Sequence, residues 1–166
     1  MGWEVFPLAI RRILNGSHAI LRSHARPVRK INDVIISLLD DMAETMYENN
    51  GVGLAAPQIG IAKRLIVVDP GEKRLIKLIN PRLLEWEGEA VDVEGCLSIP
   101  GIYGEVPRAT RVLVEALDPS GKELRLEAEG FLARILQHEI DHLDGILFLD
   151  RAIRLVDPEE KGKEGS

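Results

Sequence analysis

The sequence has little of several features that mark specialised protein classes. It has one cysteine, Cys96, among 166 residues, so no disulfide can form within the chain and we expect a reducing compartment. No run approaches the roughly 18 apolar residues that a membrane helix needs, and Arg11 and Arg12 interrupt the first apolar stretch too early for a secretory signal. We therefore expect an intracellular, cytoplasmic protein with no membrane partner, and an organelle stays an open alternative.

Basic residues are also few, with 21 Lys and Arg against 27 Asp and Glu, for a net charge of −6. A nucleic-acid-binding protein normally carries a basic patch, and no long Lys/Arg run is present, so no DNA partner is expected. Hydrophobic residues make up 45% and charged residues 29%, an ordinary globular composition. At roughly 100–200 residues per domain, residues 1–166 are predicted to form a single domain, with 158–166 as a frayed tail.

Apolar residues recur at three- and four-residue steps in two stretches, which predicts helices at about 32–48 and 130–143. Between them, short apolar or alternating runs closed by turn residues predict strands. One of these strands is expected to end at Asn80-Pro81, and the last two form a hairpin around 118–121. Strands between helices without regular alternation indicate an α+β fold, with mixed or antiparallel sheets packed around the second helix. The predicted strands are Leu65–Val68, Leu75–Ile79, Arg111–Leu117 and Glu123–Ala128.

The second predicted helix contains the motif H-E-x-x-H, with His138, Glu139 and His142. Residues four apart on a helix share a face, so both imidazoles can reach one metal ion. The glutamate lies beside that face and can take a proton from water. A solvated polar helix face is the alternative, but Leu136, Ile140 and the rest of the amphipathic pattern weaken it.

A hydrolytic metal site needs a third protein ligand and an open position for water. Phe148 stands where a metzincin would have its third histidine, and Glu159 and Glu160 lie in the polar tail. The third ligand is therefore expected upstream, and Cys96 in E-G-C-L-S is the candidate. From the residues alone, Cys96 could also be a small buried side chain or a catalytic nucleophile paired with a histidine.

A loop of small residues, G-V-G-L-A-A-P-Q-I-G, spans 51–60. Glycines and alanines let a backbone approach another backbone or a ligand closely. The loop is neither a phosphate-binding P-loop nor a dinucleotide fingerprint. Taken alone, such a loop more often serves simple packing than ligand binding.

The motifs G-V-G-L-A-A-P-Q, E-G-C-L-S and Q-H-E-I-D-H, in this order, resemble the three signature motifs of the peptide deformylase family. The resemblance runs from about Ile10 to Arg151. It implies a metal-dependent hydrolase that removes the formyl group from the N-terminal formylmethionine of nascent polypeptides and releases formate. It also implies one divalent metal ion held by Cys96, His138 and His142. The native ion that the resemblance implies is Fe²⁺, and Zn²⁺, Ni²⁺ or Co²⁺ can substitute for it. The donor set alone would favour zinc.

The resemblance implies further roles for individual residues. Glu139 would take the proton of the attacking water and deliver it to the departing amine. The Gln58 side-chain amide and the Leu97 backbone N–H would stabilise the oxyanion. Gly53 and its neighbours would hold the peptide backbone like an added strand. The methionine side chain is expected to lie against Val52, Leu97, Phe131 and Arg134.

Some features depart from the family pattern or leave alternatives open. Tyr103 stands where other bacterial members have a basic residue, which leaves the partner of Glu94 undetermined. The chain after Arg151 is short and acidic, so transient ribosome contact also stays open. Two other functions compete: an endopeptidase, which would need a longer cleft, and a non-catalytic module that binds metal or nascent chains. The joint presence of Gln58, Cys96 and H-E-x-x-H favours the deformylase.

Overall fold

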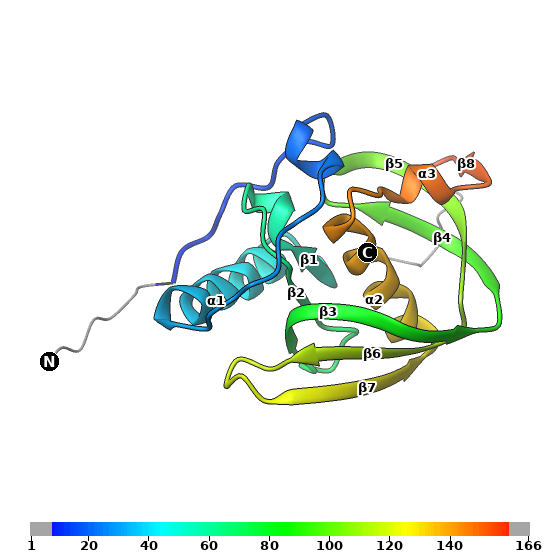
Figure 1. Cartoon of the computed structure of the whole chain (residues 1–166). Coiled ribbons are helices and arrows are strands. Elements are labelled where there is room, and N and C mark those ends of the chain that lie inside the picture. Colours follow the sequence, from blue (N-terminus) through cyan, green and yellow to red (C-terminus); the bar gives the residue numbers. More distant parts are fainter. Residues whose placement is uncertain (1–7, 160–166) are drawn as a thin grey trace, which may run out of the picture.

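The computed structural model describes residues 8–159, which form two antiparallel β-sheets, three α-helices and two 3-10 helices (Figure 1). The predicted α+β class is confirmed. Residues 160–166 of the expected tail lie outside the described range. Within that range, no helix is both long and apolar enough to cross a membrane. The elements are η1 (Ala19–Arg22), α1 (Asp33–Glu48), β1 (Gly53–Ala55), η2 (Ala56–Ile59), β2 (Leu65–Val68), β3 (Ile76–Glu87), β4 (Ala90–Cys96), β5 (Ile99–Arg108), β6 (Arg111–Leu117), β7 (Glu123–Glu129), α2 (Gly130–Leu143), α3 (Phe148–Arg151) and β8 (Arg154–Val156).

Helix α1 forms where the apolar spacing predicts it. The Asn32 side chain accepts a hydrogen bond from the Ile35 N–H at 3.1 Å and caps the first turn. Its apolar face, with Leu39, Met42 and Met46 fully buried, packs in one hydrophobic cluster with residues of β2. Burying each such side chain stabilises the fold by about 1.5–3 kcal/mol. This face therefore attaches α1 to the sheet.

The larger sheet has five antiparallel strands in the order β1-β2-β3-β6-β7. The sequence analysis predicts that the strand beginning at Leu75 ends at Ile79. This end is wrong, because β3 continues through Asn80 and Pro81 to Glu87. The register shifts between Ile79 and Arg82, so the missing N–H of Pro81 falls in a bulge. The Asn80 side chain also exchanges hydrogen bonds of 2.8 and 2.9 Å with the backbone of Val28. The Asn-Pro pair therefore bends this strand instead of ending it.

The smaller sheet has three antiparallel strands in the order β4-β5-β8. In the sequence it shows only as a strand-like stretch before Cys96, because many of its side chains are exposed and the alternation is weak. Its strand β4 matters most for the site, because Glu94 and Cys96 lie at its end.

Helix α2 occupies the predicted range of 130–143 and contacts β1, β2, β3 and β7 of the larger sheet. Strands β4 and β5 cover its other side (Figure 1). The helix ends before Gly145, whose φ is 75°. A Cβ at that position would also lie 2.7 Å from the Arg22 backbone, so glycine is required by both conformation and space.

Candidate metal centre and surrounding pocket

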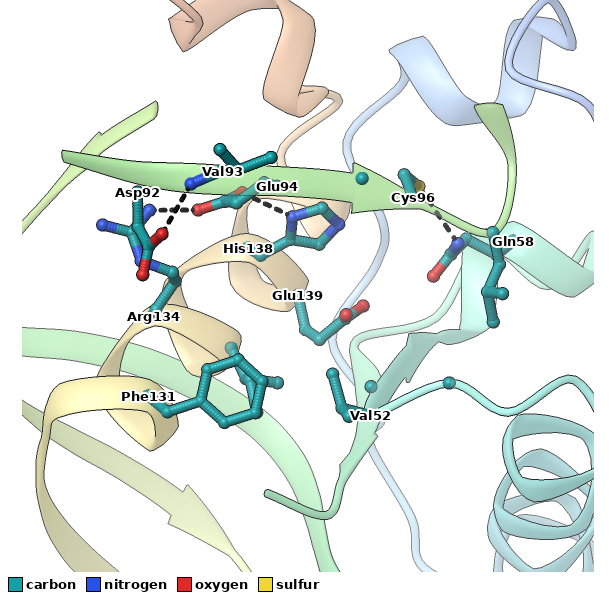
Figure 2. A pocket seen from close by; sticks show the side chains of 15 residues that line it. Val52, Gln58, Asp92, Val93, Glu94, Cys96, Phe131, Arg134, His138 and Glu139 are labelled. Carbon is teal, nitrogen blue, oxygen red and sulfur yellow. Dashed lines mark hydrogen bonds and ion pairs between the residues drawn. The ribbon is translucent and has the colours of Figure 1, made fainter. Parts of the chain in front are cut away.

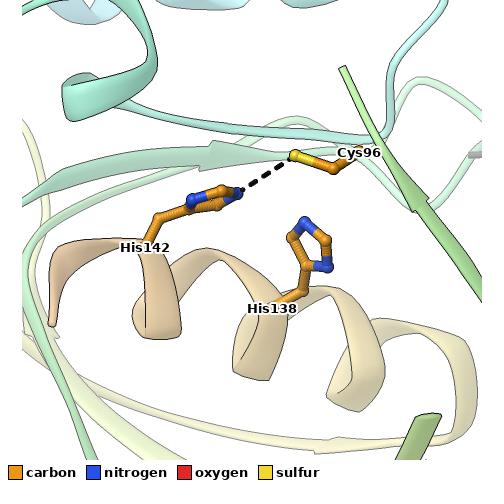
Figure 3. Close-up of side chains that lie close together, drawn as sticks. All are labelled: Cys96, His138 and His142. Atoms are coloured by element: carbon orange, nitrogen blue, oxygen red, sulfur yellow. Dashed lines mark hydrogen bonds between the residues drawn. The ribbon is translucent and has the colours of Figure 1, made fainter. Parts of the chain in front are cut away.

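Two histidines project from successive turns of α2 toward the end of β4, where Cys96 lies (Figure 3). The His142 Nε2 is 3.4 Å from the Cys96 Sγ. Ligand atoms from Cys96, His138 and His142 all lie within 4.8 Å of one another. Burial lowers the pKa of His142 well below its usual value, so its ring is neutral, the form that coordinates a metal ion. The structure therefore brings together the three predicted ligands from two distant parts of the chain.

His138 is oriented by a carboxylate behind it. Its Nδ1 lies 2.9 Å from Glu94 Oε1, which leaves Nε2 directed toward the thiol and the other histidine. A hydrogen bond of this kind fixes the tautomer and the ring orientation of a metal-binding histidine. The partner of Glu94, left undetermined by the sequence, is thus a set of three side chains: His138, Arg108 and Arg134.

Glu94 is almost fully buried, and cations saturate its carboxylate. Arg108 donates two hydrogen bonds to it, of 2.9 and 2.8 Å, and Arg134 donates a third of 2.6 Å. Burial alone would raise the pKa of Glu94, but the hydrogen bonds from Arg108 and His138 hold that pKa well below its usual value. Glu94 is therefore a fixed negative charge behind the metal ligands.

The same arginine links the site to a second carboxylate of α2. Arg108 donates a hydrogen bond of 2.6 Å to Asp141, and Arg151 from α3 donates two more, of 2.6 and 2.9 Å. The Arg108 side chain is 3% exposed and that of Arg151 is 45% exposed. The network therefore runs from the metal ligands to the surface, and each buried charge in it has a partner of opposite sign.

Glu139 is the exception among the buried charges. It is 4% exposed, and its Oε1 has no hydrogen-bond partner among residues 8–159. Burial raises the pKa of Glu139 to about 7, although the nearby His138 lowers it. Gly53 of β1 lies directly against this carboxylate, where a Cβ would come within 2.9 Å of the Glu139 Cγ. Glycine is thus required at 53 to leave room for Glu139.

Gln58 lies on η2, and its side chain approaches the Cys96 thiol from a different element than the two histidines. Its Oε1 accepts a hydrogen bond of 3.0 Å from the Ala55 N–H, so its NH₂ group faces the pocket. The Gln58 Nε2 lies 3.6 Å from Cys96 Sγ and 3.2 Å from Ser98 Oγ. Ser98 belongs to the E-G-C-L-S motif, but nothing in the spacing of the motif residues predicts its contact with Gln58.

A pocket opens beside these groups (Figure 2). The pocket is lined by apolar side chains, by the polar groups described above and by Asp92 of β4. The structure places every sequence-predicted site residue here except His142, which lies behind the lining. The predicted residues that line the pocket are Val52, Gly53, Gln58, Cys96, Leu97, Phe131, Arg134, His138 and Glu139.

The chain is similar to known proteins in sequence and in fold. The profile of the polypeptide deformylase family matches residues 10–157. The chain belongs to this family. A peptide deformylase of Caldicellulosiruptor bescii is 55% identical over 153 residues, which cover 92% of each chain.

Solved structures of peptide deformylases have the same fold. The crystal structure from Thermotoga maritima superposes with a TM-score of 0.85 at 41% identity, covering 87% of this chain and 98% of that one. A class I type b peptide deformylase from Acinetobacter baumannii, solved with Met-Ala-Ser bound, has a TM-score of 0.82 at 38% identity. That comparison covers 86% of this chain and 98% of that one.

Membership of the peptide deformylase family implies a divalent metal ion, and the residues present fit one. A thiol and two imidazoles are donors that bind zinc, iron, cobalt and nickel. Their ligand atoms cluster tightly, and Glu94 supplies the outer hydrogen bond that orients a metal-binding histidine. Glu139, with its unpartnered Oε1, lines the same pocket as Cys96 and His138.

Proposed function

We infer that this chain is a peptide deformylase: it removes the N-formyl group from nascent polypeptides and releases formate. The observation that carries this conclusion is the cluster of Cys96, His138 and His142 ligand atoms beside the buried, unpartnered Glu139 carboxylate. We propose that a single catalytic domain of residues 1–166 performs the reaction. The proposed compartment is the bacterial cytoplasm.

Cys96, His138 and His142 would hold the divalent ion. Such an ion supplies Lewis acidity, which makes water a nucleophile near neutral pH and polarises a carbonyl oxygen. We propose Fe²⁺ as the native ion, on the strength of the family resemblance. A donor set of one sulfur and two nitrogens, without a carboxylate or carbonyl oxygen, supports a soft or borderline transition metal over Mg²⁺ or Ca²⁺.

Glu139 is the proposed general base and acid. Its carboxylate takes the proton of the attacking water and then delivers it to the departing α-amine, so that the formyl C–N bond breaks and formate leaves. A pKa of about 7 suits both halves of this transfer, because the group can accept and release a proton near neutral pH. The Glu139 Oε1 has no hydrogen-bond partner among residues 8–159, so no structural contact in that range engages this oxygen.

Gln58 and Leu97 are the proposed oxyanion donors. The NH₂ group of Gln58 faces the pocket from one side, and Leu97 lines it immediately after Cys96. Donors fixed in a buried site stabilise developing negative charge on the formyl oxygen without having to reorient. Removing one such donor costs about 10²–10³ in kcat.

The peptide substrate would extend along β1. Strand β1 lies at the edge of the larger sheet and pairs only with β2 among the described strands, so its outer edge can accept another strand. Gly53 offers its backbone there, while Val52 and Leu97 would contact the methionine side chain. The Met-Ala-Ser bound to the Acinetobacter baumannii enzyme supports a peptide of this kind as ligand.

Further partners are part of the proposal. The substrate is made on the ribosome, so we propose transient ribosome contact, although the residues after Glu159 lie outside the described range. The net charge of −6 supports the absence of a DNA partner.

The activity is tested with formyl-Met-Ala-Ser and unformylated Met-Ala-Ser, each incubated with anaerobically purified protein. A deformylase releases formate from the first peptide and cleaves no peptide bond in either. Peptide-bond cleavage would indicate an endopeptidase, and binding without any product would indicate a non-catalytic module. Either result would contradict the proposed function.

The proposed link between iron, oxygen and the Cys96 thiolate is tested by exposure to air. We predict that the iron form loses activity while the zinc form survives longer, because ferrous iron reacts with oxygen and zinc has no redox chemistry. Apo-protein is loaded with each metal, and formate release and the mass of the Cys96 peptide are followed together. Equal lifetimes, with Cys96 unmodified in both forms, would contradict the link between iron, oxygen and this thiolate.

A further inference from the structure

Both the oxygen and the nitrogen of the side-chain amide of Gln58, the proposed oxyanion donor, make hydrogen bonds within the protein. The Ala55 N–H donates to its Oε1 at 3.0 Å, and its own NH₂ group donates to Ser98 Oγ at 3.2 Å. An amide NH₂ has two hydrogens, so one can serve Ser98 while the other points toward the thiol and the pocket. The torsion at the end of a glutamine side chain is broad, so without such contacts the amide would rotate freely.

Ser98 is itself fixed within the protein. It is 1% exposed, and Gln58 is 2% exposed, so water has little access to their hydrogen bond. A contact of this kind is stronger in a buried site than at the surface, because water cannot replace it. The Ser98 hydroxyl is therefore placed to determine where the Gln58 amide points.

The N-terminal segment 14–16 ties these two residues together through their backbones. The Leu14 N–H donates to the Gln58 carbonyl oxygen and the Gly16 N–H to the Ser98 carbonyl oxygen, both at 2.7 Å. A Cβ on Gly16 would lie 2.9 Å from Ile99 Cγ1, so the segment approaches the start of β5 closely. Side chain and backbone thus hold η2 and the turn after β4 at one spacing.

We propose that Ser98 is a positioning residue for deformylation: its hydroxyl holds the Gln58 amide in the direction that meets the formyl oxygen. This inference rests on the proposed role of Gln58 in the reaction. Ser98 is buried and is not among the residues that line the pocket, so its role would be exerted through Gln58. Its contribution is expected in the transition state, where the amide acts, and not in ground-state binding.

A double-mutant cycle tests this role. We expect Ser98→Ala to lower kcat by about three- to tenfold, the factor that one neutral hydrogen bond gives, with KM within about twofold. In the Gln58→Ala background the same substitution should change kcat by less than about twofold, because the amide that it positions is absent. Equal losses in both backgrounds, or a loss confined to KM, would overturn the proposal. Full activity of Gln58→Ala would instead contradict the proposed role of Gln58 itself.

A second readout follows the amide directly, without activity. In ¹⁵N NMR spectra, Ser98→Ala should shift the Gln58 side-chain NH₂ signals and speed their exchange with water, while Ser98→Thr keeps the hydroxyl and preserves both the signals and kcat. Thr45→Ala is the matched control: it removes another buried hydroxyl, one that accepts a 2.8 Å hydrogen bond from the Arg11 N–H. It should leave the Gln58 signals and kcat unchanged. Unshifted Gln58 signals in Ser98→Ala would overturn the proposal.

Discussion

Helices α1 and α2 both pack against the five-stranded sheet, but their buried faces differ in kind. Helix α1 buries Leu39, Met42 and Met46 against other apolar side chains, and its buried polar side chains, Asp41 and Thr45, bond the N-terminal segment at Ala9 and Arg11, away from the pocket lining. Helix α2 buries apolar residues on one side and, on the other, charged or polar ones, which are Arg134, Glu139, Asp141 and His142. An apolar face stabilises through burial alone, whereas a buried charge is tolerated only where partners surround it.

The charged side of α2 is stable because its neighbours arrive from elsewhere in the chain. Glu94 on β4 and Arg108 on β5 pair with each other and with groups of α2. Among the described residues, Glu139 is the only one with a buried side-chain oxygen that lacks a hydrogen-bond partner. One buried nitrogen, the Nδ1 of His142, also lacks a partner. The comparison teaches that α1 serves the fold, while α2 combines structural ion pairs with one group kept for chemistry.

The largest effect is expected where the charged face meets the proposed metal. Cys96→Ser replaces a thiolate with a hydroxyl, which stays protonated and binds transition metals poorly. We predict loss of most metal and most formate release, with the fold retained because serine is close to cysteine in size and keeps the backbone pairing of β4 with β5. Metal content by mass spectrometry and circular dichroism check this. Full metal content with normal turnover would show that Cys96 is a packing residue.

A smaller but still large effect is expected in the ion network. Arg108→Met leaves Glu94 and Asp141 buried with fewer partners and should lower the free energy of unfolding by about 3–5 kcal/mol. Arg151→Met, which removes the exposed partner of the same Asp141, should cost less than about 1 kcal/mol. Chemical denaturation measures both. Equal losses would mean that burial does not set the strength of this network.

The apolar face of α1 should respond in stability alone. Leu39→Ala removes a fully buried side chain and should cost about 2–5 kcal/mol, because it leaves a cavity. Val34→Ala on the same helix, 61% exposed, should change stability by less than about 0.5 kcal/mol. At a temperature where both variants are folded, kcat should equal that of the parent protein. A drop in kcat for folded Leu39→Ala would show that α1 also serves the reaction.

The sequence predicted what depends on local spacing. The period of α1 and the four-residue separation of His138 and His142 both lie within a few turns of chain, and each is found as expected. The extension of β3 past Pro81 was missed, because a proline ends a strand only where its N–H would be needed. That condition depends on the register of the neighbouring strand.

Contacts between distant segments of the chain also could not be predicted from the sequence. The Arg108 side chain joins Glu94 to Asp141, and neither pairing leaves a periodic signal in the sequence. Ser98 stands inside a recognised motif, yet its contact with Gln58 follows only from how η2 meets the turn after β4. The family motifs supplied the candidate site residues, while the packing of the two sheets around α2 determines which of them touch.

The central claim is that Glu139 moves the proton in this site, and Glu139→Gln tests it most directly. The substitution keeps the shape of the side chain and the three proposed ligands but removes the proton acceptor. The account predicts about one divalent ion per chain and formate release slower by about two to four orders of magnitude. Unchanged turnover would contradict the claim, and so would loss of the metal together with activity, which would make Glu139 a structural or coordinating residue.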